Sequence, residues 1–273
     1  MHEAEVDMKK NGIFSRLYLV LVTTLSYLPI FVVVLYSFNE SKISSVWGGF
    51  SLKWYEKLFA DDAMFEALGN SIILGALSAL IAAVIATMAA LGMRESRLPF
   101  KGVIEYVSSL PIMIPEIILG MVFLVYFSLI GLNFGFGTLL IAHVSFSIPY
   151  VYMQVKARLV GLDQNCLDAA RDLGASPVRV FFDVTLPMIT PALISGMFLA
   201  FAMSFDDVII SVFVSGVGNS TLPVKVYTQI KTGTTPEINA LCTLMLAATL
   251  LCYLISVAAS LYGTRKNKNS KEK

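Results

Sequence analysis

FLAFAMSFDDVIISVFV, residues 198–214, places two adjacent carboxylates inside an apolar run that is long enough to lie in a membrane. A charged side chain at the centre of a bilayer costs at least about 2.5 kcal/mol, even on lenient insertion scales. Ionisable residues in such segments therefore usually face a water-filled path or pair with another group. We expect Asp206 and Asp207 to mark a functional position within a membrane span.

The whole chain has the composition of an integral membrane protein. Of its 273 residues, 56% are hydrophobic and 14% are charged, and the mean hydropathy is +0.75. Each apolar run is long enough for a helix that crosses about 30 Å of hydrocarbon, and none alternates as the strands of a membrane barrel do. The sequence predicts an all-α fold with six transmembrane helices, at about Leu17–Tyr36, Ala67–Met93, Gly102–Ile130, Gly137–Val155, Pro191–Val214 and Ala240–Tyr262.

The basic residues are unevenly distributed between the two sides of these six spans. Fifteen of the 20 Lys and Arg residues fall on the side that also holds both termini. Because basic residues favour cytoplasmic loops, we expect both termini in the cytoplasm. The predicted organisation is a cytosolic segment at 1–16, a transmembrane domain at 17–262 with a cytosolic loop at 156–187, and a basic cytosolic tail at 263–273.

The predicted cytosolic loop at 156–187 has the pattern of two short helices. Asp163 suits an N-cap, and Gly174 suits the left-handed position that ends a helix. Ala169 and Ala170 present almost no side chain, so another protein could approach this face closely. The spacing fits either a docking element for a partner or a plain solvated helix between two spans.

The same loop resembles the cytosolic consensus of permease subunits in ABC importers. That consensus reads E-A-A, three residues, G, nine residues, then I-x-L-P, and this chain departs from it by Asp168 for Glu and Val184 for Ile. The resemblance implies the ABC importer permease arrangement, with a coupling helix between spans four and five. The residues that it implies for coupling to an ATPase are Asp168, Ala169, Ala170, Gly174, Leu186 and Pro187.

Further stretches resemble the PotC-type permease subunits of spermidine/putrescine importers. They are KWY at 53–55, PEI at 115–117, AARDLGAS at 169–176, SFDDVIISVFVSG at 204–216, LPVKVYTQIK at 222–231 and PEINAL at 236–241. The resemblance implies a multi-pass protein of the bacterial inner membrane that binds polyamine. The substrate-binding positions that it implies are Trp54, Glu116, Ser204, Asp206 and Asp207.

The resemblance also implies partners within the lipid bilayer and on both sides of it. These are a second homologous permease, a homodimeric cytosolic ATPase that holds ATP and magnesium, and an external substrate-binding protein that delivers polyamine. The chain itself would then hold no cofactor and no metal, and it would bind no nucleic acid.

The third intramembrane acid, Glu116, also points to a binding site on physical grounds. It follows Pro111 and Pro115, which remove two backbone donors and interrupt a helix close to mid-bilayer, a feature of substrate sites in transporters. No predicted span carries a central Lys or Arg that could neutralise the three acids. A cationic substrate, a partner subunit or protons could each supply the countercharge.

A continuous helix through the fifth span would place Ser204 and Ser211 on the same face as Asp207. We therefore expect a polar strip within an otherwise apolar helix. His143, inside the fourth span, is expected to be packed or hydrogen-bonded rather than a metal ligand. Trp54 lies in a loop where anchoring at the membrane surface is the ordinary role of a tryptophan.

Other functional classes lack their sequence signals in this chain. The Gly-Lys dipeptide of a P-loop is absent, and no nucleophile arrangement, metal-ligand spacing or basic aromatic patch is present. These observations argue against an enzyme and leave no catalytic residue to name. The alternatives that stay open are an ABC permease for another small cation and a stand-alone proton-coupled carrier.

Overall fold

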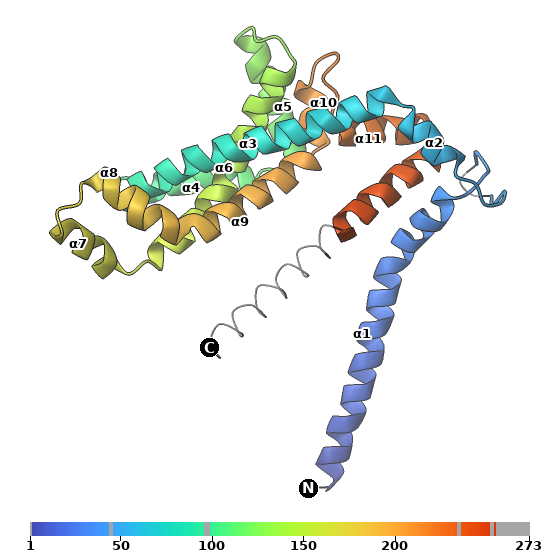
Figure 1. The fold of residues 1–273 in the computed structure, drawn as a ribbon, viewed down its shortest axis with the longest axis horizontal. Coiled ribbons are helices and arrows are strands. Elements are labelled where there is room, and N and C mark those ends of the chain that lie inside the picture. The colour runs from blue at the N-terminus through green and yellow to red at the C-terminus, as the bar shows by residue number, and fades with distance from the viewer. Residues whose placement is uncertain (1, 44–45, 96–98, 234–235, 252–253, 255–273) are drawn as a thin grey trace, which may run out of the picture. The chain divides into compact units, whose positions relative to one another are not determined.

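The computed structural model describes residues 2–43, 46–95, 99–233, 236–251 and 254, and the named elements of this part are all helices (Figure 1). An isolated bridge joins Asn39 to Phe50. The all-α prediction is confirmed. The helices are α1 (His2–Ser37), α2 (Lys53–Phe59), α3 (Asp62–Glu95), α4 (Lys101–Met113), α5 (Glu116–Leu129), α6 (Phe136–Val160), α7 (Gln164–Asp172), α8 (Pro177–Val180), the π-helix η1 (Phe181–Thr185), α9 (Leu186–Phe205), α10 (Ile209–Val214), α11 (Leu222–Thr232) and Pro236–Leu251.

Four helices of the described residues are long and apolar enough to cross a membrane: Phe14–Ser37, Asp62–Arg94, Phe136–Val160 and Pro177–Phe205. A fifth span results if α4 and α5, which meet at 106°, are counted as one. The shorter apolar helix Pro236–Leu251 covers the first half of the predicted sixth span. The count of six therefore stays a prediction, because most of that span beyond residue 251 lies outside the described residues.

The structure describes the predicted boundary between residues 16 and 17 but not the predicted C-terminal tail. At the N-terminal end, α1 runs without a break from His2 to Ser37, so the predicted boundary between 16 and 17 is not a break in the helix. Its apolar part begins at Phe14. The predicted basic tail at 263–273 lies outside the described residues.

The chain forms two compact units, residues 1–62 with 229–273 and residues 63–228, and each is described by itself. In the first unit, α2 buries Trp54 and Leu58. The Lys57 ammonium lies 2.5 Å from a carboxylate oxygen of Glu237, which is 2% exposed. This ion pair joins α2 to the helix Pro236–Leu251 across most of the sequence.

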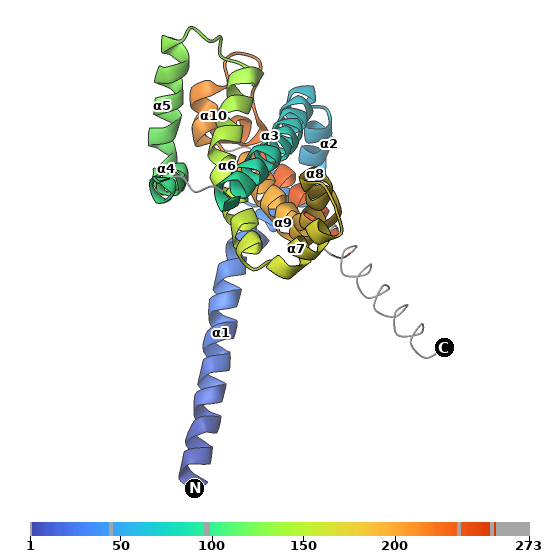
Figure 2. The same ribbon diagram turned by 90° about the vertical axis from the view of Figure 1, so that its left-hand side faces the viewer.

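The second unit is built on α3, α6 and α9, which lie side by side (Figures 1 and 2). Small side chains let these helices approach one another closely, as is common between membrane helices. Gly196 of α9, for example, packs against Val151 of α6. The buried alanines of α3 in this core are Ala79, Ala82, Ala83, Ala86 and Ala90.

A second group of apolar side chains in this unit holds α5 and α10 against α6. Phe127 of α5, Leu139 of α6 and Ile210 of α10 are all buried in it. The sharp bend between α4 and α5 is visible in Figure 2, where α5 rises away from α4. This bend and the packing of α5 on α10 position the acids described below.

The loop between α6 and α9 contains the two short helices that the sequence predicts. The Asp163 carboxylate accepts a hydrogen bond from the Asn165 amide at 2.9 Å and caps α7. Gly174 follows α7 with φ +82°, and Ser176 caps α8 through the Arg179 amide. The sequence did not predict η1, the π-helical turn at Phe181–Thr185 that connects α8 to α9.

Candidate functional site

The predicted fifth span is not a continuous helix, because α9 ends at Phe205 and α10 begins at Ile209. The Asp207 carboxylate accepts hydrogen bonds from the backbone amides of Ile210 at 3.2 Å and Ser211 at 2.8 Å. These amides belong to the first turn of α10, where a helix lacks its own acceptors. The assumption of one helix through Asp207 was therefore wrong, because α9 stops at Phe205 and the Asp207 carboxylate binds the first turn of a new helix.

A chain of hydrogen bonds runs from α3 through α9 and α6 to this break. Ser78 Oγ donates to Ser204 Oγ at 3.1 Å, and Ser204 Oγ lies 2.7 Å from His143 Nδ1. On the other side of the ring, His143 Nε2 lies 3.1 Å from Ser211 Oγ. Ser211 Oγ then donates to Asp207 Oδ2 at 2.7 Å.

These five residues form one connected network, and each of them is buried. A neutral His143 with its proton on Nε2 satisfies both contacts, because Nδ1 then accepts from Ser204 while Nε2 donates to Ser211. Buried polar groups that are all paired fix the positions of the helices that carry them. The network therefore holds the Asp207 carboxylate in one orientation.

The two adjacent aspartates lie in different surroundings. Asp207 is 7% exposed and is held by the network, whereas the Asp206 side chain is exposed. Asp206 is thus the member of the pair that another molecule can reach. From the sequence, the same role was predicted for Asp206 and Asp207, because a pattern of residue types does not show which of two adjacent aspartates binds the amides of a helix.

A second helix break, between α4 and α5, places Glu116 near the break between α9 and α10. Glu116 is the first residue of α5, directly after Pro115, so the predicted interruption is confirmed at Pro115, whereas Pro111 lies inside α4 and does not interrupt it. One turn later, Gly120 lets α5 lie against α10, since a Cβ added there would be 2.6 Å from the ring of Phe213. Glu116 and Gly120 share a face of α5 that is turned toward α10.

The three acids lie close enough to interact electrostatically. Glu116 is within reach of the charges of both Asp206 and Asp207, and it is exposed. Tyr150 of α6 is half-buried and lies within reach of the Glu116 charge. Two helix breaks in one unit thus bring Glu116 within electrostatic reach of Asp206 and Asp207, which lie 90 and 91 positions later in the sequence.

The other two predicted substrate-binding residues are placed differently. Ser204 lies in the buried network and contacts Ser78 and His143, not solvent. Trp54 belongs to the first unit, where its indole Nε1 donates to the Asn39 carbonyl at 2.6 Å and the residue is 4% exposed. A role of either residue in binding stays a prediction.

The residues expected to couple to an ATPase lie on and beside α7. Asp168 and Ala169 are exposed on α7, and Leu173, which follows the helix, is 89% exposed. Ala170 accepts a hydrogen bond through its carbonyl from the Ala175 amide at 3.1 Å, which closes the turn at Gly174. Leu186 and Pro187 open α9 on the other side of η1.

The sequence reasoning missed Ser78 and underestimated His143. A histidine inside a membrane span is by default a functional candidate whose partner should be named, and this signal was available. Its partners Ser204 and Ser211 were predicted as members of a polar strip on one helix, and Ser204 also as a substrate-binding position, but neither was predicted to contact His143. Ser78, on a different span, gave no signal of its own.

The comparison with known proteins agrees with this architecture. Residues 82–265 match the family model described as "Binding-protein-dependent transport system inner membrane component". The chain is 37% identical over 243 residues to the spermidine/putrescine transport system permease protein PotC of Haemophilus influenzae, over 89% of this chain and 93% of that protein. It is 42% identical over 237 residues to the putrescine transport system permease protein PotI of Escherichia coli K12, over 84% of each chain.

Solved structures of ABC transporters share the fold. A bacterial ABC transporter involved in the import of the acidic polysaccharide alginate superposes with a TM-score of 0.70, at 14% identity over 90% of this chain and 94% of that chain. The MetNI methionine ABC transporter gives 0.56, at 18% identity over 71% and 90%. With a family model over most of its length, close curated relatives and this fold, the chain belongs to the inner membrane components of binding-protein-dependent transport systems.

Proposed function

We propose that this protein is the membrane-spanning permease subunit of an ATP-driven polyamine importer. The observation that carries the proposal is the meeting of Glu116, Asp206 and Asp207 at two helix breaks. Interrupted helices near mid-bilayer are where transporters bind their substrates. Carboxylates recognise alkylammonium groups through charge-assisted hydrogen bonds, so this site suits a substrate with several positive charges.

The relatives support the same substrate class. Proteins named for spermidine/putrescine and putrescine transport cover most of the chain at 35% to 42% identity. In this proposal Asp206 and Glu116 contact the substrate directly, because both are exposed at the breaks. Asp207 positions the break, since its carboxylate is engaged with the first turn of α10.

The proposal includes an assembly around this chain. A second homologous permease completes the pathway, a homodimeric cytosolic ATPase binds ATP and magnesium, and an external binding protein delivers the substrate. Both termini and residues 156–187 face the cytoplasm of a bacterium, as the distribution of basic residues favours. The exposed face of α7, with Asp168 and Ala169, then meets the ATPase.

The test is uptake of radiolabelled putrescine and spermidine into vesicles that contain the assembled transporter. Uptake should require ATP, the binding protein and this chain. Uptake that persists without ATP and is abolished by a protonophore would show a proton-coupled carrier instead. Accumulation of another cation in place of both polyamines would support an ATP-driven importer but contradict polyamine as its substrate.

A structural role for the acids gives a different result. If the acids only pair with the second permease, neutralising one of them leaves a buried charge unmet and lowers the amount of assembled complex. Uptake should therefore be measured per assembled complex. Loss of uptake in strict proportion to lost complex for Asp206→Asn and Glu116→Gln would contradict a substrate site.

A further inference from the structure

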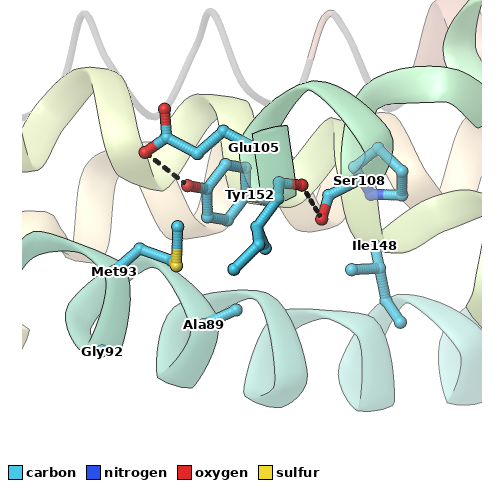
Figure 3. Close-up of a pocket in the computed structure, with 9 residues that line it drawn as sticks. Ala89, Gly92, Met93, Glu105, Ser108, Ile148 and Tyr152 are labelled. Carbon is cyan, nitrogen blue, oxygen red and sulfur yellow. Dashed lines mark hydrogen bonds between the residues drawn. The ribbon is translucent and has the colours of Figure 1, made fainter. Parts of the chain in front are cut away.

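Two tyrosines of α6 lie on nearly opposite sides of this helix. Tyr150 and Tyr152 are two residues apart, so their side chains leave the helix about 200° apart. Tyr152 is buried, and its hydroxyl donates to Glu105 Oε1 at 3.4 Å beside an apolar cavity of about 460 Å³ between α3, α4 and α6 (Figure 3). Glu105 also pairs with Lys156, whose ammonium lies 2.7 Å from Oε2. On this side of α6, the tyrosine and the glutamate are therefore both engaged with the protein itself.

Tyr150 lies on the face of α6 that is turned toward the break between α9 and α10. It follows His143 by seven residues and Phe146 by four, so the three side chains share one face of the helix. His143 and Phe146 are both buried, and their rings lie 5.2 Å apart between centroids. Since His143 is hydrogen-bonded to serines on both sides of the break, Tyr150 lies two turns further along the same face.

The packing of Tyr150 also places it among the segments that carry the two exposed acids. Tyr150 is half-buried and packs against the apolar group that holds α5 and α10 against α6. Leu119, one turn after Glu116, and Met203, one turn before Asp206, pack against the same group. Tyr150 is also within reach of the Glu116 charge. Packing and electrostatics thus agree on a position beside the three acids.

The Tyr150 hydroxyl forms no hydrogen bond with the residues that the structure describes. In this it differs from the Tyr152 hydroxyl, which is bonded to Glu105. A phenol hydroxyl can accept one hydrogen bond and donate another, and a polar group loses free energy when it leaves water without a partner. The Tyr150 hydroxyl is therefore available to a molecule that enters between the helix breaks.

An alkylammonium group needs such a neutral acceptor in addition to carboxylates. It carries three N–H donors, and each of them must be satisfied when the group leaves water. Glu116 and Asp206 supply negative charge, but a further carboxylate would add repulsion between like charges. A phenol oxygen accepts a hydrogen bond without adding charge, and its ring attracts a cation that approaches its face.

We propose that Tyr150 is a further substrate-binding residue, whose hydroxyl accepts a hydrogen bond from the ammonium group that Glu116 binds. The inference rests on the proposed function, because it assigns one more group to the binding of the same polyamine. It also gives α6 a direct part in the site, beside the acids of α5 and of the break between α9 and α10. Tyr152, on the other side of α6, takes no part in it.

The first experiment compares uptake in two variants that each lose one hydroxyl. Uptake of labelled putrescine per assembled complex, at a concentration below half-saturation, should fall about tenfold for Tyr150→Phe, because a hydrogen bond to a charged group is lost. Tyr152→Phe is the matched control, since it makes the same chemical change on the same helix. Its uptake per assembled complex should stay at the wild-type level.

The second experiment separates contact with the substrate from a structural role. Putrescine should raise the thermal unfolding midpoint of the assembled transporter in detergent, measured against sodium chloride at equal ionic strength. For Tyr150→Phe, the putrescine concentration that gives half of this rise should increase about tenfold, while the midpoint without putrescine stays unchanged. Tyr152→Phe should show the reverse, with a lower midpoint without putrescine and an unchanged half-saturating concentration, because it loses the bond to Glu105.

Three results would overturn the inference. Wild-type uptake and wild-type half-saturation in Tyr150→Phe would remove the hydroxyl from the site and leave the proposed function standing. A lower midpoint without putrescine, together with unchanged half-saturation, would make the hydroxyl a structural group. A wild-type transporter that takes up neither putrescine nor spermidine would reject the proposed function, and with it the substrate that Tyr150 is inferred to bind.

Discussion

His143 Nε2 lies 3.5 Å from Asp207 Oδ2, and the side chains of both residues are almost completely buried. The two residues come from different helices, and Ser211 bridges them through its hydroxyl. Asp207 also lies in the break between the end of α9 at Phe205 and the start of α10 at Ile209. This contact thus ties the helix break to α6, the central helix of the second unit.

Replacing His143 by Phe should destabilise the protein while keeping the volume of the ring. The Ser204 and Ser211 hydroxyls each lose one buried hydrogen bond and keep the bonds to Ser78 and Asp207, so the total loss should be about 1–3 kcal/mol. The free energy of unfolding in detergent, measured with a denaturant, checks the loss. Ser145→Ala is the control, because Ser145 Oγ donates to the Ile141 carbonyl of its own helix at 2.7 Å and takes no part in the network around His143. Equal stability of the two variants would show that the network contributes nothing.

Asp206 and Asp207 should respond differently to neutralisation. Asp207→Asn keeps one acceptor oxygen but places an amide against the donors of α10, so it should lower stability and assembly. Asp206→Asn should assemble normally and lower uptake of labelled putrescine by about one to two orders of magnitude, if a charge-assisted bond worth about 1.5–3 kcal/mol is lost in the transport transition state. Uptake and assembled complex are measured together. The reverse ranking of the two variants would contradict the assigned roles.

Gly120→Val should separate α5 from α10 and move Glu116. A Cβ at this position meets the Phe213 ring at 2.6 Å and the Ile210 Cα at 3.4 Å, so the helices must shift. Overpacking of this kind costs about 1–3 kcal/mol. Gly137→Val is the control, because a Cβ at Gly137 has nothing within 4 Å. The thermal unfolding midpoint and polyamine uptake should both fall for Gly120→Val and not for Gly137→Val. An equal fall in the control would show that valine is poorly tolerated at any of these glycines.

Gly174→Val and Ala170→Glu should uncouple the proposed ATPase from transport. Gly174 has φ +82°, which a β-branched residue adopts only with strain, so the turn after α7 should be misplaced. Ala170→Glu adds bulk and charge beside the exposed Asp168 and Ala169. Both variants should insert normally, and both should lose the stimulation of ATP hydrolysis by binding protein and substrate. Full stimulation in both would argue against docking at α7.

The predicted orientation can be tested with single cysteines at Ser176 and Val217 in a background without Cys166, Cys242 and Cys252. Ser176 precedes α8, and Val217, which is fully exposed, follows α10. An impermeant thiol reagent added to intact cells should label position 217 and not position 176. Labelling of position 176 before lysis would place the loop at 156–187 outside.

The amino-acid sequence by itself determined the class of the fold and part of the local structure, but not η1 or the break between α9 and α10. Apolar runs, the excess of basic residues on one side, the cap at Asp163 and the glycine after α7 are all local signals, because hydropathy, capping and positive φ depend on neighbouring residues. The bend at Pro115 was predictable in part, since proline removes a backbone donor, but Pro111 and Pro149 carry the same signal and lie inside α4 and α6. The identity of the acids at Glu116, Asp206 and Asp207 could also be recognised, because charges are costly in an apolar span.

Only the tertiary structure decided what each of those residues does. No proline or glycine at the break around Asp207 indicates that the helix ends there. The Asp207 side chain contacts His143, which lies 64 positions earlier in the chain and is hydrogen-bonded to Ser204. The ion pair between Lys156 of α6 and Glu105 of α4 likewise requires these two helices to pack together. Hydrogen bonds and charge clusters between distant segments arise from packing, and the pattern of residue types along a single chain does not contain that information.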